Sequence, residues 1–297
     1  MQKWLNAPDS DDISPRHHTW ERNDKHEDRP LDDVFLQEAQ STLKTKRPLT
    51  LTAKVNNTNR SVGTKLSGEI AYRYGDEGLP EGTLDIQISG SAGQSLGAFL
   101  VKGVHLTLTG EANDYVGKGM SGGEIVLKPM QESQFDASIN AIAGNTVLYG
   151  ATGGWLFVCG TVGERFAVRN SGAKTVVEGI GDHGCEYMTN GTVVVLGPTG
   201  KNFGAGMSGG IAYIYDAEDT FPKKINPAMI TIARLSANEE IELVQSLVQR
   251  HRDLTESQKA QSLLADWSLA QTRFWKVVPK PSTPPVDAAV VKVEAKV

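Results

Sequence analysis

The chain has 297 residues, of which 39% are hydrophobic, and a formal net charge of −5 at pH 7. This apolar content is sufficient for a sizeable core in one or two domains. The acidic balance argues against nucleic acid as a partner. No apolar run is long enough for a membrane-spanning helix, and the N-terminus lacks the apolar core of a signal peptide. We therefore expect a cytoplasmic protein, or one of the plastid stroma, with no nucleic-acid or membrane partner.

Residues 1–47 form a polar segment in which one short helix is predicted. The first 29 residues are highly charged and poor in apolar groups, so we expect them to be disordered on their own. Over residues 31–43, Leu31, Phe35 and Leu43 are spaced as on an amphipathic helix, and Pro30 precedes its first turn.

Residues 48–235 carry a repeated glycine grid. The phrase GKGMSGG at 117–123 returns as GAGMSGG at 204–210, and the spacing G-x-x-G-x-x-x-G recurs around both. Three close and four degenerate copies, including Arg60-Gly63-Ser67, are centred on positions 63, 93, 113, 144, 163, 184 and 200. Most successive copies lie about 16–21 residues apart, a period typical of a solenoid.

Short runs rich in Val, Ile, Leu and aromatic residues lie between the glycines. They predict strands over residues 84–88, 104–108, 124–127, 155–158, 175–177, 192–195 and 211–215. In the second run Val104, Leu106 and Leu108 alternate with polar His105 and Thr107, as in a strand with one buried face. The fold class predicted is therefore all-β: a parallel β-helix of about seven coils with short flanking α-helices.

Glycine is predicted at the corners of these coils because it adopts positive φ without a Cβ penalty. The corner glycines are Gly63, Gly93, Gly97, Gly117, Gly119, Gly122, Gly144, Gly163, Gly184, Gly200, Gly204, Gly206 and Gly209. Asparagine tolerates the left-handed conformation better than most residues, so we expect it at Asn113, Asn145, Asn170 and Asn190 as well.

Two capping-box patterns, SANE at 236–239 and TESQ at 255–258, follow the last repeat. They predict C-terminal helices within residues 236–278, with apolar residues at helical spacing after each box. Pro279 is expected to end the regular structure that precedes it, and residues 279–297 are expected to be a disordered tail.

The phrases GKGMSGG and GAGMSGG both contain G-x-G-x-x-G, the pattern that binds dinucleotides when a helix begins on its last glycine. Here residues 124–127 and 211–215 follow and are predicted as strands, which favours corner glycines over nucleotide binding. Asp182, His183 and Cys185 lie close in sequence but supply too few ligands for a metal, so we interpret them as packing residues.

Arg165, Arg169 and Glu186 are interpreted as part of a solvated face, with a charged groove as the alternative. No catalytic, cofactor-binding or metal-binding residue is predicted on this chain. Its two cysteines provide neither a disulfide framework nor the thiolate set of an iron–sulfur cluster.

From residue 59 to about residue 278 the chain resembles the C-terminal GXGXG domain of the large (alpha) subunit of glutamate synthase. The resemblance is carried by blocks such as GEANDYVGKGMSGGEIV (110–126), GDHGCEYMTNGTVVVLGPTGKNFGAGMSGG (181–210) and LLADWSLAQTRFWKVVPK (263–280). It implies a right-handed β-helix within an oxidoreductase that makes two glutamates from glutamine and 2-oxoglutarate. It also implies an amidotransferase domain and a synthase domain with FMN and an iron–sulfur cluster as partners, none of whose catalytic residues maps onto this chain.

We therefore expect a non-catalytic structural domain or subunit of glutamate synthase that serves ammonia assimilation and holds those two domains in register. The electron donor, NAD(P)H or ferredoxin, is left open. So is the choice between a separate subunit and part of a longer chain. The alternatives are an independent β-helix enzyme or a binding module, including one like the β-helical subunit of formylmethanofuran dehydrogenase.

Overall fold

The computed structural model describes residues 29–130 and 132–280, so the expected disorder of the N-terminal segment and of the tail lies outside the described residues. The helices and strands, in chain order, are α1 Leu31–Thr45, β1 Leu49–Val55, α2 Thr64–Tyr74, β2 Leu84–Ala92, β3 Val104–Ala112, β4 Ser121–Lys128, β5 Ala141–Ala143, β6 Gly153–Val162, β7 Ser171–Ile180, β8 Asn190–Val195, β9 Ile211–Tyr215, β10 Ile230–Arg234, α3 Asn238–Thr255, α4 Gln258–Ala265, α5 Trp267–Ala270 and β11 Phe274–Pro279.

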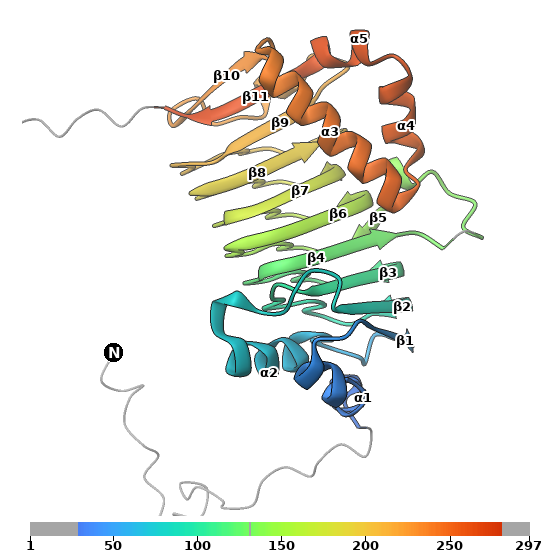
Figure 1. The fold of residues 1–297 in the computed structure, drawn as a ribbon. Coiled ribbons are helices and arrows are strands. Elements are labelled where there is room, and N and C mark those ends of the chain that lie inside the picture. Colours follow the sequence, from blue (N-terminus) through green and yellow to red (C-terminus); the bar gives the residue numbers. More distant parts are fainter. Residues whose placement is uncertain (1–28, 131, 281–297) are drawn as a thin grey trace, which may run out of the picture.

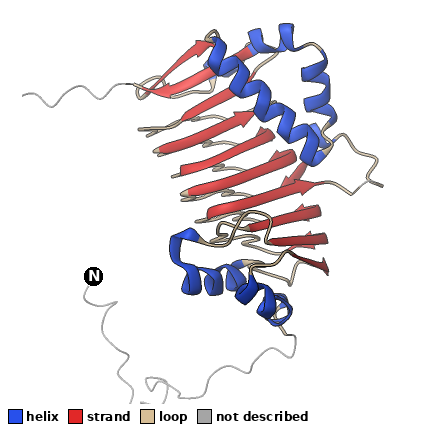
Figure 2. Ribbon diagram, viewed as in Figure 1, coloured by secondary structure: helices blue, strands red, loops and turns tan. Residues whose placement is uncertain are grey.

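Most of the strands stack as the rungs of one parallel solenoid (Figures 1 and 2). The order β1-β2-β3-β4-β6-β7-β8-β9 follows the sequence, with the short β5 placed beside β3 and β6. Equivalent positions of successive coils pair directly, as Gly90 does with Gly110. The predicted fold class is confirmed, and each predicted strand run lies within β2, β3, β4, β6, β7, β8 or β9.

The number of coils is about six, not seven. The copy Arg60-Gly63-Ser67 is not a coil but the start of helix α2, in which Leu66, Ser67 and Ile70 are buried. The carboxylate of Asp32 in α1 accepts hydrogen bonds from the backbone N–H groups at the beginning of this helix, including Gly63 and Lys65 at 2.7 Å each. The prediction failed there because a glycine at positive φ precedes a helix as readily as it forms a coil corner.

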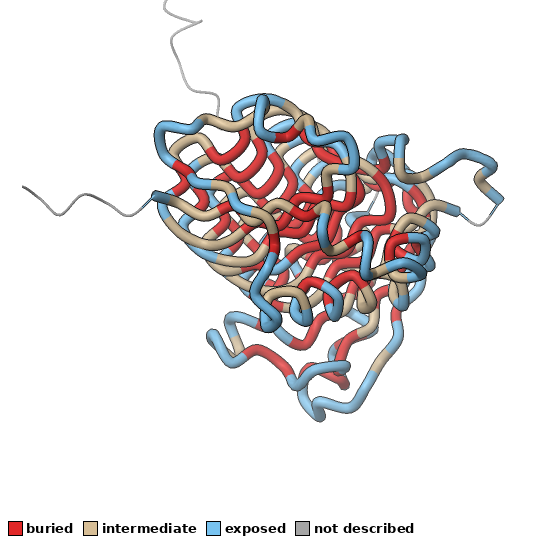
Figure 3. The backbone as a smooth tube through the Cα atoms, turned by 90° about the horizontal axis from the view of Figure 1, so that it is seen from above, coloured by how far each residue is buried: buried red, intermediate tan, exposed pale blue. Residues whose placement is uncertain are grey.

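Each coil sends alternate strand residues into the solenoid. Val104, Leu106 and Leu108 are buried in the interior, as their alternation predicts, and α1 and α2 add apolar side chains to one end of the same core. Figure 3, which looks along the stack, shows buried segments recurring at the same place in successive coils. Stacking thus builds one continuous core from units that could not bury an apolar face alone.

A second, smaller core lies on the outside of the sheet. Phe157 and Val176 point away from the interior and are covered by helices α3 to α5. Figure 1 shows α3 lying across the strands of this face. A buried polar contact fixes it there, because Glu178 of β7 accepts a hydrogen bond from Ser257 and lies 3.5 Å from Nε2 of His251 in α3. No helix among the described residues is long and apolar enough to cross a membrane.

The C-terminal helices form, but neither predicted capping box does. Helix α3 begins after Ala237 without a side-chain cap, and Thr255 is its last residue. Glu256 takes a left-handed conformation that ends α3, which leaves Ser257 to cap α4 by accepting from the N–H of Ala260 at 2.9 Å.

Residues 274–278, expected among the C-terminal helices, and Pro279, expected to begin the tail, form strand β11. This strand pairs antiparallel with β9 on one side and with β10 on the other, so it closes the exposed edge of the last coil. Its run FWKVV is rich in aromatic and β-branched residues, which favour strands. The open edge of the sheet therefore pairs with this run, although helices precede it in the chain.

Candidate interaction surface

Six tight turns stack along one side of the solenoid, and each contains three left-handed residues spaced two apart. In the turn after β3 these are Tyr115, Gly117 and Gly119, with φ of 67°, 63° and 64°. The full set lies at 95/97/99, 115/117/119, 146/148/150, 165/167/169, 183/185/187 and 202/204/206. We call the outward surface of residues 95–99, 115–119, 146–150, 165–169, 183–187 and 202–206 the GxG face.

This backbone shape is imposed by hydrogen bonds between coils. The N–H groups of Arg165 and Arg169 donate forward to carbonyls of the next coil at 2.8 and 2.9 Å. The N–H of Ala167, between them, donates back to the carbonyl of Val147 at 2.9 Å. The N–H groups of residues 165, 167 and 169 therefore point alternately to the next and to the preceding coil. This pattern requires that φ changes sign from each residue of the turn to the following one. The middle residue faces the core, where Ala167 is fully buried, and the outer two face solvent.

The predicted corner glycines divide into two groups. Positive φ occurs at Gly63, Gly97, Gly117, Gly119, Gly204 and Gly206, of which Gly63 precedes α2 and the others belong to the GxG face. The remaining positions lack positive φ, and there a Cβ would overlap a neighbouring atom: Gly93, Gly122, Gly144, Gly163, Gly184, Gly200 and Gly209. At Gly209 the obstacle is the backbone carbonyl of Thr189 in the preceding coil.

The expectation for asparagine was wrong. Asn113, Asn145, Asn170 and Asn190 do not have positive φ. Their side chains instead serve as hydrogen-bonding groups, as Oδ1 of Asn145 accepts from the N–H of Glu164 in the next coil at 2.8 Å. Several left-handed positions hold larger residues, such as Tyr115 and Arg165, because hydrogen bonds between coils decide the backbone there.

The sequence neighbours Asp182, His183 and Cys185 do not converge on a common point. The Cys185 thiol is buried in the core, which raises its pKa, while Nδ1 of His183 contacts Oε1 of Glu186 at 2.6 Å. Asp182 accepts from the N–H of Lys201 at 2.7 Å. Within residues 29–130 and 132–280, no three His, Cys, Asp or Glu side chains are grouped to hold a metal ion.

The other cysteine is also shielded. Cys159 lies beside Glu178 and Thr255 below helix α3, and burial, followed by the Glu178 carboxylate, raises its pKa to about 12. A thiol with this pKa stays protonated at neutral pH, so it is a poor nucleophile.

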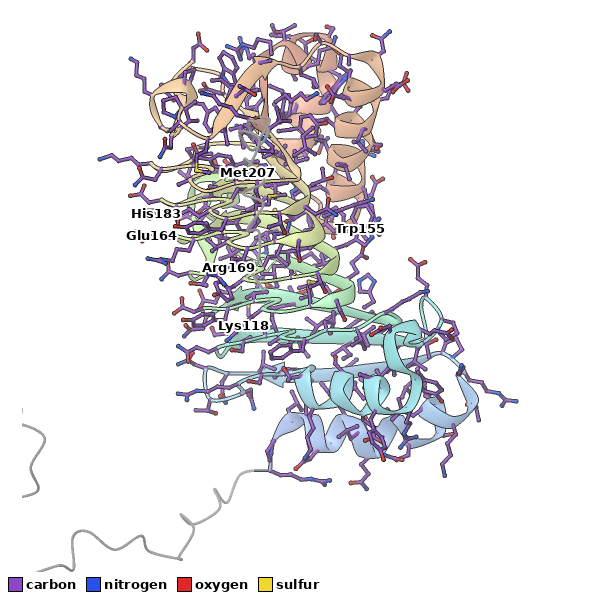
Figure 4. All side chains as sticks on the ribbon, turned by 90° about the vertical axis from the view of Figure 1, so that its left-hand side faces the viewer. Lys118, Trp155, Glu164, Arg169, His183 and Met207 are labelled. Carbon is purple, nitrogen blue, oxygen red and sulfur yellow. The ribbon has the colours of Figure 1, made fainter. Side chains whose placement is uncertain are left out.

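Charged residues of the GxG face point outward. Figure 4 shows Lys118, Glu164, Arg169 and His183 on the side of the stack away from Trp155. Glu186, interpreted with Arg165 and Arg169 as part of one solvated face, follows Arg169 by one coil, and its side chain pairs with His183. An open depression of about 580 Å³ lies on this face and is lined by residues that include Tyr115, Lys118, Tyr149 and Arg165.

A feature that the sequence did not reveal is the seating of aromatic rings on glycines. The ring of Phe99 lies over Gly119 of the next coil, where a Cβ would be 2.6 Å from it, and the ring of Tyr187 lies over Gly206 in the same way. Both glycines are the second of a GxGMSGG phrase. The available signal was an aromatic residue one coil before each phrase.

Both GxGMSGG phrases lead into strands, β4 and β9, as predicted. The helix N-terminus that a dinucleotide fingerprint needs is therefore replaced by a sheet at both places. Repeated glycine turns that stack into a parallel solenoid, with helices covering one outer face, define the class of this molecule.

The family model of the GXGXG motif matches residues 32–280, and the chain belongs to this family. It is 51% identical over 250 residues to a glutamate synthase [NADH] of Schizosaccharomyces pombe, covering 84% of this chain and 12% of that relative. It is 48% identical over 279 residues to the ferredoxin-dependent glutamate synthase 2 of Synechocystis, covering 93% and 18%. It is 49% identical over 255 residues to the glutamate synthase [NADPH] large chain of Bacillus subtilis, covering 85% and 17%.

These matches make the chain a GXGXG domain of the glutamate synthase type. The chain spans less than a fifth of the length of each of these three relatives. The rest of each relative corresponds to no part of this chain.

Proposed function

We propose that the chain is the non-catalytic structural domain of a glutamate synthase. It holds an amidotransferase domain and an FMN-binding synthase domain in register, within an enzyme that converts glutamine and 2-oxoglutarate into two glutamates. The observation that carries the proposal is the match to glutamate synthases along most of this chain, combined with its regular stack of bonded coils. Such a stack suits a spacer, because each coil is tied to its neighbours by backbone hydrogen bonds.

The cofactors of the proposed enzyme, FMN and an iron–sulfur cluster, are assigned to the neighbouring domains. Iron–sulfur clusters are held mainly by several cysteine thiolates. This chain has two cysteines, and both are buried in different surroundings, so its donor set does not fit a cluster. The assignment to glutamate synthase also implies a cytoplasmic or plastid-stromal location.

Co-expression tests this proposal. The chain, carrying a tag, is expressed with the remaining domains of a glutamate synthase large chain and purified through the tag. We expect the remaining domains to co-purify. We also expect more glutamate per glutamine hydrolysed when the chain is present, because ammonia is then passed on and not lost. Equal coupling of the two reactions with and without the chain would refute the structural role.

A further inference from the structure

Over its first five turns, the described part of the GxG face has no free backbone edge with which to bind a partner. The N–H of Thr146 donates to Glu164 of the next coil at 2.7 Å, and the N–H of Leu148 donates to Val116 of the preceding coil at 2.8 Å. The same alternation continues through the first five turns; in the sixth, the N–H of Gly204 donates back to Gly184, and no acceptor for the N–H groups of Asn202 and Gly206 is found among the described residues. A partner over these five turns must therefore be recognised by side chains and not by strand addition.

Aromatic side chains on this face are exposed and yet held in place. Phe99 is 53% exposed and Tyr187 is 57% exposed, although large apolar side chains usually avoid water. Each ring lies against a glycine of the next coil, Gly119 or Gly206, which limits its motion. Rigid aromatic side chains lose little conformational entropy on binding and are common anchors at interfaces.

Cationic side chains supply part of the hydrogen-bonding capacity that is left on this side. Asp114 accepts from the N–H of Asn145 at 2.7 Å, while Asp182 and Glu186 are engaged as described above. By contrast, four cationic side chains of this side make no ion pair or side-chain hydrogen bond with any residue that the structure describes: Lys118, Arg165, Arg169 and Lys201.

Elsewhere on the described chain, some cations have ionic partners and others, such as Lys54 and Lys223, do not. Lys128 pairs with Glu256 at 2.7 Å, and Arg250 pairs with Glu124 while lying over the Trp155 ring. Among the described acids beside this face, Glu164 lines the depression without an ion pair, and Asp114 and Asp182 accept backbone N–H groups but make no ion pair either. Free guanidinium groups next to exposed aromatic rings suit a carboxylate-bearing protein surface, since arginine binds carboxylates in a two-pronged geometry.

We propose that the GxG face is where the solenoid docks against the other domains of the synthase, and that the docked surface presents Asp and Glu side chains. Lys118 and Arg165 receive carboxylates at the depression, Arg169 extends the cationic row, and Phe99 and Tyr187 supply apolar contacts. This inference rests on the proposed function and adds which face is used and the chemistry of the partner.

The test measures binding of the full chain to the remaining two-domain part of a glutamate synthase large chain, at low and high salt. Arg165→Glu combined with Arg169→Glu should weaken binding by about tenfold or more, because each change places like charges together. The matched control, Lys54→Glu with Lys223→Glu, changes the same charge at exposed residues outside the GxG face. Wild-type binding should weaken as salt rises.

Lys118→Glu provides a second variant, because Lys118 is not one of the left-handed residues and its replacement does not disturb a strained backbone. It should weaken binding in the same direction while the urea midpoint of the free chain stays unchanged. If the Arg and Lys118 variants bind as wild type does, the GxG face is not the interface, although the structural role stands. An equal loss in the control variant also overturns the inference. Absence of wild-type binding overturns both this inference and the proposed function.

Discussion

At the scale of single residues, glycine is required in this chain for two different physical reasons. At Gly150 the backbone has a φ of 64° and a Cβ would meet nothing within 4 Å. At Gly209 the backbone is ordinary, but a Cβ would overlap the carbonyl oxygen of Thr189. A side chain at the first position would strain the backbone. A side chain at the second position would clash, because two coils approach closely there.

This difference leads to a prediction about stability. Gly209→Ala should lower the free energy of unfolding by about 3 kcal/mol, the upper part of the range for overpacking, because the backbone of the preceding coil must move. Gly150→Ala, the control, should cost about 1 kcal/mol from left-handed strain alone. Urea unfolding of both variants measures the two values. If Gly209→Ala costs no more than Gly150→Ala, close packing between coils is not the reason for glycine at 209.

At the scale of elements, one carboxylate ties the C-terminal strands to the last coil. Asp216, which follows β9, accepts from the N–H of Phe221 at 2.8 Å, from the N–H of Thr220 at 3.1 Å and from the Trp275 indole of β11 at 3.2 Å. Burial raises the pKa of Asp216, but these hydrogen bonds outweigh it, so the pKa lies below its ordinary value. The ionised form therefore stabilises the junction of β9 and β11.

The sign of this shift gives a pH dependence. Because the folded state binds the proton of Asp216 less tightly than the unfolded state, the stabilisation is complete above the ordinary pKa of about 3.9 and is lost as the pH falls through the folded pKa. Asp216→Asn should lower the free energy of unfolding by about 1–2 kcal/mol at neutral pH. The gap to wild type should narrow as the solution is acidified below that ordinary pKa.

Urea unfolding over a pH series measures this effect. Glu218→Gln, at an exposed residue of the same loop, serves as the control and should leave stability nearly unchanged at each pH. A difference between wild type and Asp216→Asn that stays constant into the acid range would show that the Asp216 carboxylate does not contribute through its charge.

At the scale of the whole molecule, the solenoid is a stack of nearly interchangeable rungs. Leu84 of β2 pairs with Val104 of β3, and the register continues without a shift to Ala92 and Ala112. The outer face of these two strands is polar, unlike the face that α3 covers. Removing residues 84–103 would therefore join Thr83 to Val104 and shorten the stack by one rung of about 4.8 Å.

The deletion variant tests whether the length of the stack matters. We expect it to fold, because repeat stability is mainly the sum of contacts between neighbours. In the assembled enzyme, less glutamate should form per glutamine hydrolysed, since the spacing of the two catalytic domains has changed. Urea unfolding is the control for folding, and the ratio of glutamate to hydrolysed glutamine is the measurement. An unchanged ratio in a folded variant would argue against a role in spacing.

The sequence by itself determined the parallel solenoid, because its signals are local and repeat. The alternation of Val104, Leu106 and Leu108 sets which side chains enter the core, and the glycine period sets where each coil turns. The same repeated motif identified the family, and the functional proposal follows from that family.

Only the tertiary structure decided which residues take the unusual backbone and how the stack ends. Arg165 and Tyr187 are left-handed because peptide groups of adjacent coils bond to them, a constraint from residues distant in sequence. The helix at Gly63 and the strand at 274–279 likewise depend on contacts with Asp32 and with β9. The GxG face, with its seated rings and unpaired cations, exists only once the coils are stacked, because each coil contributes one turn to it.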